Sequence, residues 1–581
     1  MKTRPTTVLY GESDAFLRPK AAHSKRVPEL NNFNKSAKSR AILFLFATSA
    51  AVGLALPRAD ADTVFQQIGL TQLQTISPNI NGAGVSVGQV EASISSTNVN
   101  LFEPNSSNAP NTQFTYFDGS GTSSGAYNPA DGSWHANYVA SFFYGANGAG
   151  VSPGVSHVYV FQEGDYYFDI YEAYAPATYM KAGIAKIINQ SFVYSNETAS
   201  QIGPLDATWD NYAAEFGTLY VSAVGDGGTG FQTGTTPVSY VNPPSDSYNG
   251  IAVAAYGGAT GFGPTYDGRS KPDITAPGAY SSYTAPIISG AAALLVQAGE
   301  GTNLSGPVGL GASDTSVVAA GALTYSSNST DPRTLKALLL NGASKPQGWT
   351  NSYSISGTNY TYNSATAYAT TPLDPRYGSG IVNIYSSYEN LNGGEHHFSG
   401  ATTTPLGVVV SAVPNLPTVS AFDGWDFNSI TASTTADGAN HYVFSLPGSS
   451  NNSWDVTATL DWNKDFGAIG INHLMLYLLN SNGAAIASST SMIDNVQQIS
   501  LGGNTGLNAL APGKYDLVVQ MLGGSDAIIS GGSLQASEQY ALAWNFTDPA
   551  QTPEPGSLVI LAFGLLAIVS AGRTRGRRLS P

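Results

Sequence analysis

Two adjacent serines stand directly before an apolar run of small residues, in the stretch YSSYTAPIISGAAALL from Tyr280 to Leu295. Pro286 suits the first turn of a helix, where its missing N–H loses no hydrogen bond, and the run from Ile287 onward supplies a buried helical face. A serine at such a helix start lies near unpaired N–H donors and the positive end of the helix dipole, which stabilise developing negative charge. Serine is also a common helix cap, and this stretch alone favours capping over nucleophilic chemistry.

Two histidines lie between Gly82 and Leu391. His157 falls in the apolar run HVYVFQ, where packing is the expected role. His135 opens the helical pattern HANYVASFFYG, so its ring can extend from a fixed backbone and act as a general base. Taken by itself, such a histidine is more often an ordinary residue of a first helical turn.

Glu91 ends the predicted strand that contains GVSVGQV. A carboxylate at the C-terminal end of a buried parallel strand emerges on the crevice side of the sheet, where it can orient a histidine and stabilise its charge. The alternative is a solvated loop acid. The combination favours a catalytic triad, because His135 follows Glu91 by 44 residues and Ser282 follows His135 by a further 147.

The elements around these residues alternate between strand and helix from about Gly82 to Tyr388. HVYVFQ, AKIINQSF, TLYVSAVG and YNGIAVAAYG read as strands, and SWHANYVASFFYG, ATWDNYAAEFG and DPRTLKALLLNGA read as helices. This alternation predicts a doubly wound α/β fold with a parallel sheet covered on both faces. Its active residues should lie at strand ends and helix starts, which is where the candidates fall.

Beyond about Leu391 the pattern changes to short strands separated by turn residues, which predicts a β-sandwich. This part resembles the jelly-roll-like domain that follows many secreted bacterial peptidases. It offers no specific chemistry, since its histidines lack metal-ligand spacing with partners. They are His396, His397, His441 and His473.

The order acid, histidine, serine on such a sheet is the subtilisin order, and the region 82–388 resembles the subtilases, the subtilisin-like serine peptidases. The matching segments, in chain order, are HANYVASFFYGANGAGVSPGVSHVYVF, AKIINQSF, LYVSAVGDGG, KPDITAPG and YSSYTAPIISGAAALL. The resemblance implies peptide-bond hydrolysis through an acyl-enzyme. It assigns Ser282, by its spacing from Pro286, as nucleophile in place of Ser281, His135 as base and acid, and Glu91 as the orienting residue.

The resemblance further places Ser191 and Phe192 at the edge of the substrate cleft, and Asp226 with the Ser282 N–H at the oxyanion. The family has Asn at the position of Asp226, and an ionised carboxylate would repel an oxyanion. Asp226 can therefore assist only when protonated, as the corresponding Asp is in sedolisins, which predicts activity at acidic pH. Sedolisins, however, carry Glu and Asp on the helix that here carries His135.

Other positions also depart from the subtilase pattern. The orienting acid is Glu in place of Asp, which is one methylene longer. Ala136 and Asn137 follow the histidine where the family has Gly and Thr, and Ser281 and Tyr283 flank the nucleophile where the family has Thr and Met. These departures support the competing hypothesis, a catalytically dead subtilase-fold protein that binds at a surface or in a matrix.

Both ends of the chain resemble targeting segments. Basic residues precede the apolar run AILFLFATSAAVGLAL, and ADA follows it, which indicates a signal peptide within a leader of residues 1–61. The basic part before the apolar run is long, and we favour a start codon assigned too far upstream.

At the far end, PEP at 553–555 is followed by sixteen mostly apolar residues and four arginines. This order resembles the PEP-CTERM sorting tail of Gram-negative bacteria. It implies an exosortase-type partner, transient membrane association through the tail, and export to the cell surface, the matrix or the medium. A short membrane anchor is the alternative.

The expected organisation is a leader (1–61), a subtilisin-like peptidase domain (62–390), a β-sandwich accessory domain (391–550) and a sorting tail (551–581). The part between the ends carries a formal charge of about −25, which disfavours nucleic acid and anionic lipid as partners. The chain contains no cysteine, so a thiolate metal site or nucleophile is excluded. Polypeptides are the expected substrates, and no cofactor is expected. Subtilases often bind calcium, but no acidic loop has the spacing of calcium ligands.

Overall fold

The computed structural model describes residues 58–548, apart from 96, 118–125, 147, 173–184, 195–196, 227–240, 301–327, 347–348, 350–351, 356–357, 362–371, 414, 450–451, 466, 469, 506 and 525–535. Most of the expected leader (1–57) and the whole sorting tail lie outside the described residues. Within those residues, no helix combines the length and the apolar character needed to cross a membrane.

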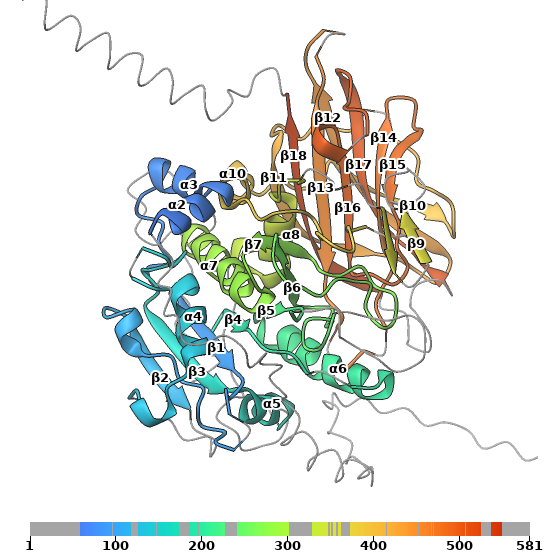
Figure 1. Ribbon diagram of the computed structural model, residues 1–581. Helices are drawn as coiled ribbons and strands as arrows, with labels where there is room; N and C mark the ends of the chain where they lie inside the picture. The colour runs from blue at the N-terminus through green and yellow to red at the C-terminus, as the bar shows by residue number, and fades with distance from the viewer. Residues whose placement is uncertain are drawn as a thin grey trace, which may run out of the picture. The chain divides into compact units, whose positions relative to one another are not determined.

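A seven-stranded sheet forms the first part of the chain, with strand order β2-β3-β1-β4-β5-β6-β7 (Figure 1). Every neighbouring pair in it is parallel. This confirms the predicted doubly wound α/β fold. The strands are β1 (Ser86–Glu91), β2 (Gln113–Phe117), β3 (His157–Gln162), β4 (Ile187–Gln190), β5 (Leu219–Ala223), β6 (Ile251–Tyr256) and β7 (Ile274–Pro277).

Helices cover both faces of this sheet. Successive strand residues point to opposite faces, so Val87 and Ile187 join the core beneath α4 and α7, whereas Val90 and Ile188 join a second core beneath α5 and α6. The helices of this part are α2 (Arg58–Gln67), α3 (Leu70–Ile76), α4 (Trp134–Phe143), α5 (Glu163–Glu172), α6 (Ala199–Phe216), α7 (Ser281–Glu300), α8 (Pro332–Asn341) and α10 (Ile384–Gly393); β8 (Ser352–Ile355) and β9 (Thr358–Thr361) form a hairpin.

Two antiparallel sheets form the second part, in agreement with the predicted β-rich region. Their orders are β10-β12-β17-β14-β15 and β11-β18-β13-β16, and large aromatic side chains such as Trp462 and Trp544 fill the core between them. The strands are β10 (Gly400–Pro405), β11 (Asp423–Thr431), β12 (Ala436–Leu446), β13 (Asp455–Trp462), β14 (Leu474–Asn480), β15 (Ala485–Ser489), β16 (Val496–Leu501), β17 (Gly513–Met521) and β18 (Ser537–Thr547).

Helix α8 lies between the two parts and contacts β13 and β18 as well as α7. On β18 the small side chains of Ala541 and Ala543 belong to the same core as α7 and α8, while Leu542 between them belongs to the sandwich core. A buried ion pair, Lys336 Nζ to Asp461 Oδ1 at 3.1 Å, joins α8 to β13. Because successive residues of a strand point to opposite faces of the sheet, β18 contributes side chains both to the sandwich core and to the core that contains α7 and α8.

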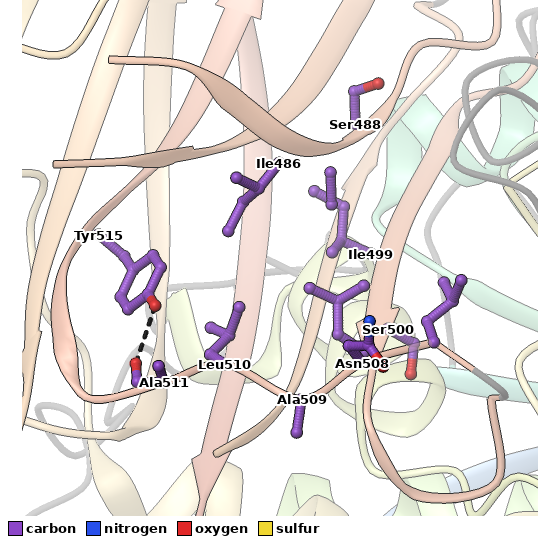
Figure 2. A pocket seen from close by; sticks show the side chains of 12 residues that line it. Ile486, Ser488, Ile499, Ser500, Asn508, Ala509, Leu510, Ala511 and Tyr515 are labelled. Carbon is purple, nitrogen blue, oxygen red and sulfur yellow. Dashed lines mark hydrogen bonds between the residues drawn. The ribbon is translucent and has the colours of Figure 1, made fainter. Parts of the chain in front are cut away.

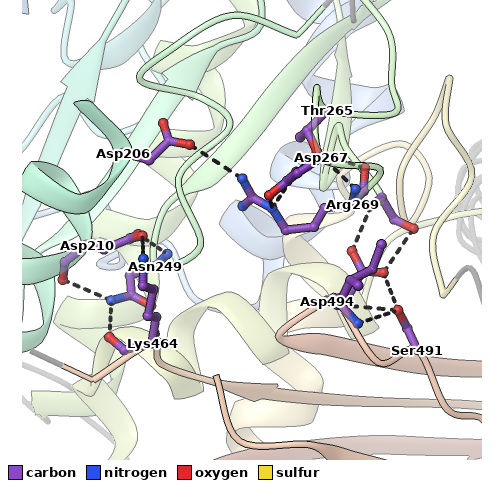
Figure 3. A network of polar contacts seen from close by, with 11 residues as sticks. Asp206, Asp210, Asn249, Thr265, Asp267, Arg269, Lys464, Ser491 and Asp494 are labelled. Atoms are coloured by element: carbon purple, nitrogen blue, oxygen red, sulfur yellow. Dashed lines mark hydrogen bonds and ion pairs between the residues drawn. The ribbon is translucent and has the colours of Figure 1, made fainter. Parts of the chain in front are cut away.

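Hydrogen bonds also join the two parts of the chain in the region near α6 (Figure 3). The Asn249 amide exchanges hydrogen bonds with the Lys464 main chain, at 2.7 and 2.9 Å. The Ser270 N–H donates to Asp494 at 2.6 Å, and burial raises the pKa of Asp494 to about 6. These bonds satisfy buried polar groups of both parts, so the sandwich packs on the first part through directed contacts and not only apolar ones.

A cavity of about 330 Å³ opens between β15, β16 and the segment that precedes β17 (Figure 2). Its lining is mainly aliphatic, with Tyr515 at one end donating a hydrogen bond to the Ala511 carbonyl at 2.8 Å. It carries no charged side chain and lies in the sandwich, so it has no part in the candidate chemistry.

Candidate active site

The three residues of the predicted triad lie at the ends of elements that the sheet holds in place. Glu91 is the last residue of β1, His135 is the second residue of α4, and Ser282 is the second residue of α7. Helix α4 begins there because Ser133 caps it, accepting a hydrogen bond from the Ala136 N–H at 3.2 Å. Helices α4 and α7 pack against each other, and their N-terminal ends meet where the ring of His135 lies 5.9 Å from the ring of Tyr283.

Glu91 and His135 form the acid–base half of a triad. His135 Nδ1 lies 2.8 Å from Glu91 Oε2, and the Glu91 side chain is fully buried. Burial by itself would lower the pKa of His135, but the Glu91 carboxylate outweighs this effect and the pKa is raised above its ordinary value. The longer Glu side chain thus reaches the imidazole nitrogen, as orientation of a general base requires.

The second carboxylate oxygen of Glu91 is held by two buried residues, Gln89 and Tyr144, which the sequence motifs did not reveal. Gln89 Nε2 donates to Glu91 Oε1 at 2.8 Å and to the Ala136 carbonyl at 3.0 Å. The Tyr144 hydroxyl in turn donates to Gln89 Oε1, which fixes the orientation of the amide. Gln89 lies two residues before Glu91 on β1, so both side chains point to the same side of the sheet. In the sequence, the supporting role of Gln89 is indicated only by the presence of a polar Gln in an otherwise apolar strand.

Ser282 is almost buried, with 8 % of its surface exposed. No hydrogen bond joins its hydroxyl to the His135 ring among the described residues, and such bonds are often formed only once substrate is present. The turn that carries it is anchored from β4. Ser191 Oγ donates to the Ser282 carbonyl at 2.8 Å and accepts from Asn189 at 2.9 Å.

The side chains of Ser191 and Phe192, predicted at the cleft edge, both point into the protein. Ser191 is 3 % exposed and engaged with the nucleophile turn, and Phe192 packs in the core beneath α5 and α6.

Asp226 follows β5 and lies beside the start of α7. Its Oδ1 accepts two hydrogen bonds from Ser281, from the N–H and from the hydroxyl, each at 2.7 Å. Ser281 Oγ also accepts from the Gly225 N–H at 3.1 Å, so the serine next to the candidate nucleophile ties the two segments together. Asp226 is an exposed residue whose carboxyl is partly desolvated against the start of α7. This desolvation raises its pKa, although the hydrogen bonds from Ser281, the nearby His135 and the Ser282 N–H oppose the effect.

Among the described residues, no group of three or more His, Asp or Glu side chains is arranged to hold a metal ion. The histidines of the sandwich have other partners. His441 Nδ1 lies 2.9 Å from Asp516, and its other nitrogen lies 2.8 Å from Thr402 Oγ1.

The sequence profile of the Subtilase family matches residues 78–380, which is more than half of the chain. The chain belongs to the subtilase family, and its class is therefore that of the serine-type peptidases. None of the curated proteins compared with the chain matches it.

Several solved structures resemble the chain at low identity. A protease from Pseudoalteromonas arctica is 17% identical, covers 58% of this chain and 98% of its own, and has a TM-score of 0.34. Fervidolysin from Fervidobacterium pennivorans, a keratinolytic enzyme related to subtilisin, is 12% identical over 83% of this chain and 79% of its own, with a TM-score of 0.33. The CspB protease of Clostridium perfringens is 14% identical over 57% and 99%, with a TM-score of 0.36. Similarities of this size do not bear on activity or substrate.

Proposed function

We propose that this chain is an exported serine endopeptidase that cleaves polypeptides through an acyl-enzyme. Ser282 attacks the scissile carbonyl, His135 accepts its proton and then donates it to the leaving amine, and Glu91 orients and charge-stabilises the imidazole. The observation that carries the proposal is the 2.8 Å contact between Glu91 and His135. His135 lies at the start of α4, which packs against α7, the helix whose second residue is Ser282.

The proposal is tested with purified residues 62–550, by covalent labelling with a fluorophosphonate probe and by casein cleavage between pH 4 and pH 8. Labelling and cleavage are expected. Absence of both would support the competing function, a binding protein that keeps the fold without catalysis. That alternative draws on the substituted positions Ala136, Asn137 and Tyr283, while the Glu91–His135 contact opposes it.

Asp226 gives the proposed enzyme a distinctive pH dependence. Its Oδ1 already accepts both Ser281 bonds, so a proton can only occupy the second oxygen, and from there it could be donated to an oxyanion. The protonated fraction of Asp226 falls as pH rises through its raised pKa, whereas the neutral fraction of His135 rises as pH rises through its own raised pKa. The two requirements act in opposite directions and predict a bell-shaped profile of kcat/KM.

Asp226→Asn should remove the alkaline limb of this profile. The amide keeps the acceptor for Ser281 and supplies a permanent N–H donor, so the variant should retain activity at pH 8. Wild type should lose about tenfold in kcat/KM for each pH unit beyond the pKa of Asp226. The measurement is kcat/KM from pH 4 to pH 9 for both proteins. An unchanged alkaline limb in the variant would mean that another donor serves the oxyanion.

Export and sorting form the remaining part of the proposal. The support is the ordered tail of PEP, apolar run and arginines, together with the apolar run after the basic leader. In a Gram-negative host with an exosortase-type enzyme, we expect removal of the tail and mature protein outside the inner membrane. Peptide mass spectrometry of surface-exposed protein checks this, and intact peptides from 573–578 would contradict it. The acidic body again disfavours nucleic acid as a partner, and the proposed chemistry needs no cofactor.

A further inference from the structure

Exposed aromatic side chains are concentrated beside the candidate triad. In the described part of the chain, eight large apolar side chains are strongly exposed, and only Trp134 and Tyr280, each 44 % exposed, are aromatic. Trp134 directly precedes His135, and Tyr280 stands two residues before Ser282. The other six are aliphatic residues or methionine elsewhere, namely Ile76, Val99, Leu406, Val408, Val409 and Met492.

The two exposed rings are the ends of a connected series, which we call the aromatic rim: Trp134, Tyr138, Tyr283 and Tyr280. Ring centroids lie 6.2 Å apart for Trp134 and Tyr138, 5.5 Å for Tyr138 and Tyr283, and 5.4 Å for Tyr283 and Tyr280. These are the separations of interacting aromatic pairs. The Tyr283 ring also lies 5.9 Å from the His135 ring, so the rim reaches the proposed base.

Core packing does not account for the rim. Helix α4 buries Ala136, Val139, Ala140 and Phe143 against the sheet and α7, whereas Trp134 is exposed and Tyr138 is half-buried. An apolar surface left partly in water and adjoining reactive groups indicates a ligand contact.

The four side chains of the rim are aromatic and carry no formal charge. Of the nearest carboxylates, Glu91 is buried and bonded to His135 and Gln89, whereas Asp226 is exposed and accepts the two Ser281 hydrogen bonds on one of its two oxygens. A planar apolar group fits such a surface, by edge-to-face or stacked contact with the rings.

We propose that the aromatic rim binds an aromatic side chain of the polypeptide substrate, within two residues of the scissile bond, and thereby selects aromatic sequences. This proposal rests on the proposed peptidase function. It adds the substrate class to that function, since side-chain contacts in an apolar subsite change kcat/KM by about tenfold to a few hundredfold.

The first test compares matched fluorogenic peptides that carry Phe, Ala or Arg at one position, scanned over two residues on each side of the cleaved bond. At one position or more, wild type should prefer Phe over Ala by about tenfold to a hundredfold in kcat/KM. Trp134→Ala and Tyr280→Ala should each lower this ratio severalfold, and Trp134→Phe should restore most of it. Met492→Ala, at an exposed apolar residue of the sandwich, is the matched control and should leave the ratio unchanged.

Equal preference for Phe and Ala at every position, or equal losses for both peptides in the rim variants, would overturn the proposal. A preference for Arg that depends on Trp134 would replace it with a cationic subsite. The second test separates it from the peptidase assignment: binding of the same peptides to Ser282→Ala protein is followed by fluorescence anisotropy. Tighter binding of the Phe peptide that is lost in Trp134→Ala would support the rim even if the wild type fails to label or cleave, and equal affinities would refute it.

Discussion

Ser282→Ala is expected to abolish labelling by a fluorophosphonate probe and to lower kcat by about 10⁴- to 10⁶-fold. The reason is that no other hydroxyl stands at this place on α7 with the backbone anchored from β4. The Ser191 hydroxyl bonded to the Ser282 carbonyl holds the turn in one position. The measurement is burst and steady-state kinetics of a chromogenic ester or peptide with the variant and wild type.

Ser281→Ala is the matched control, since it removes a hydroxyl one residue away. This hydroxyl donates to Asp226 and accepts from Gly225, so its loss loosens the contact between the two segments. We expect a loss of about tenfold, the usual effect of one hydrogen bond to a charged group. If Ser281→Ala were the variant that fails to label and Ser282→Ala remained active, the assignment of the nucleophile would be wrong.

Glu91→Gln is the second large effect, with an expected fall in kcat of about 10³- to 10⁴-fold. A Gln amide can present an N–H to His135 Nδ1, which favours the tautomer whose other nitrogen carries the proton and cannot accept one from Ser282. The carboxylate that raises the pKa of His135 is also lost, so the acidic limb should move to lower pH. Both quantities are obtained from kcat and kcat/KM measured across pH.

Gln89→Leu provides a graded comparison for Glu91→Gln. It keeps the carboxylate but removes the 2.8 Å hydrogen bond to its second oxygen and leaves the Tyr144 hydroxyl without its acceptor. We expect a loss of about tenfold in kcat, because a mispositioned base costs less than a base in the wrong tautomer. A Glu91→Gln variant within tenfold of wild type would show that Glu91 does not orient the base.

Much of the fold follows from local patterns. The alternation of apolar strands with helical patterns predicted the parallel sheet, and the series of short strands separated by turn residues predicted the β-rich region that follows. Both depend on periodicity, which neighbouring residues fix by themselves. Glu91 and His135 were predicted from their places at a strand end and a helix start, whereas the choice of Ser282 over Ser281 rested on the subtilase spacing before Pro286.

The sequence by itself therefore determined the class of fold, the subtilase motifs and the identity of the candidate triad, because each is a property of residue type and spacing along the chain. Only the tertiary structure decided which groups surround them: the Gln89–Tyr144 support behind Glu91, the Ser281 bonds to Asp226 and the aromatic rim. Tyr144 lies 55 positions from Gln89, and Ser281 lies 55 positions from Asp226. In the aromatic rim, Tyr138 and Tyr283 are 145 positions apart. Sequence spacing does not fix such distances, since they depend on how strands order in the sheet and how α4 and α7 pack upon it.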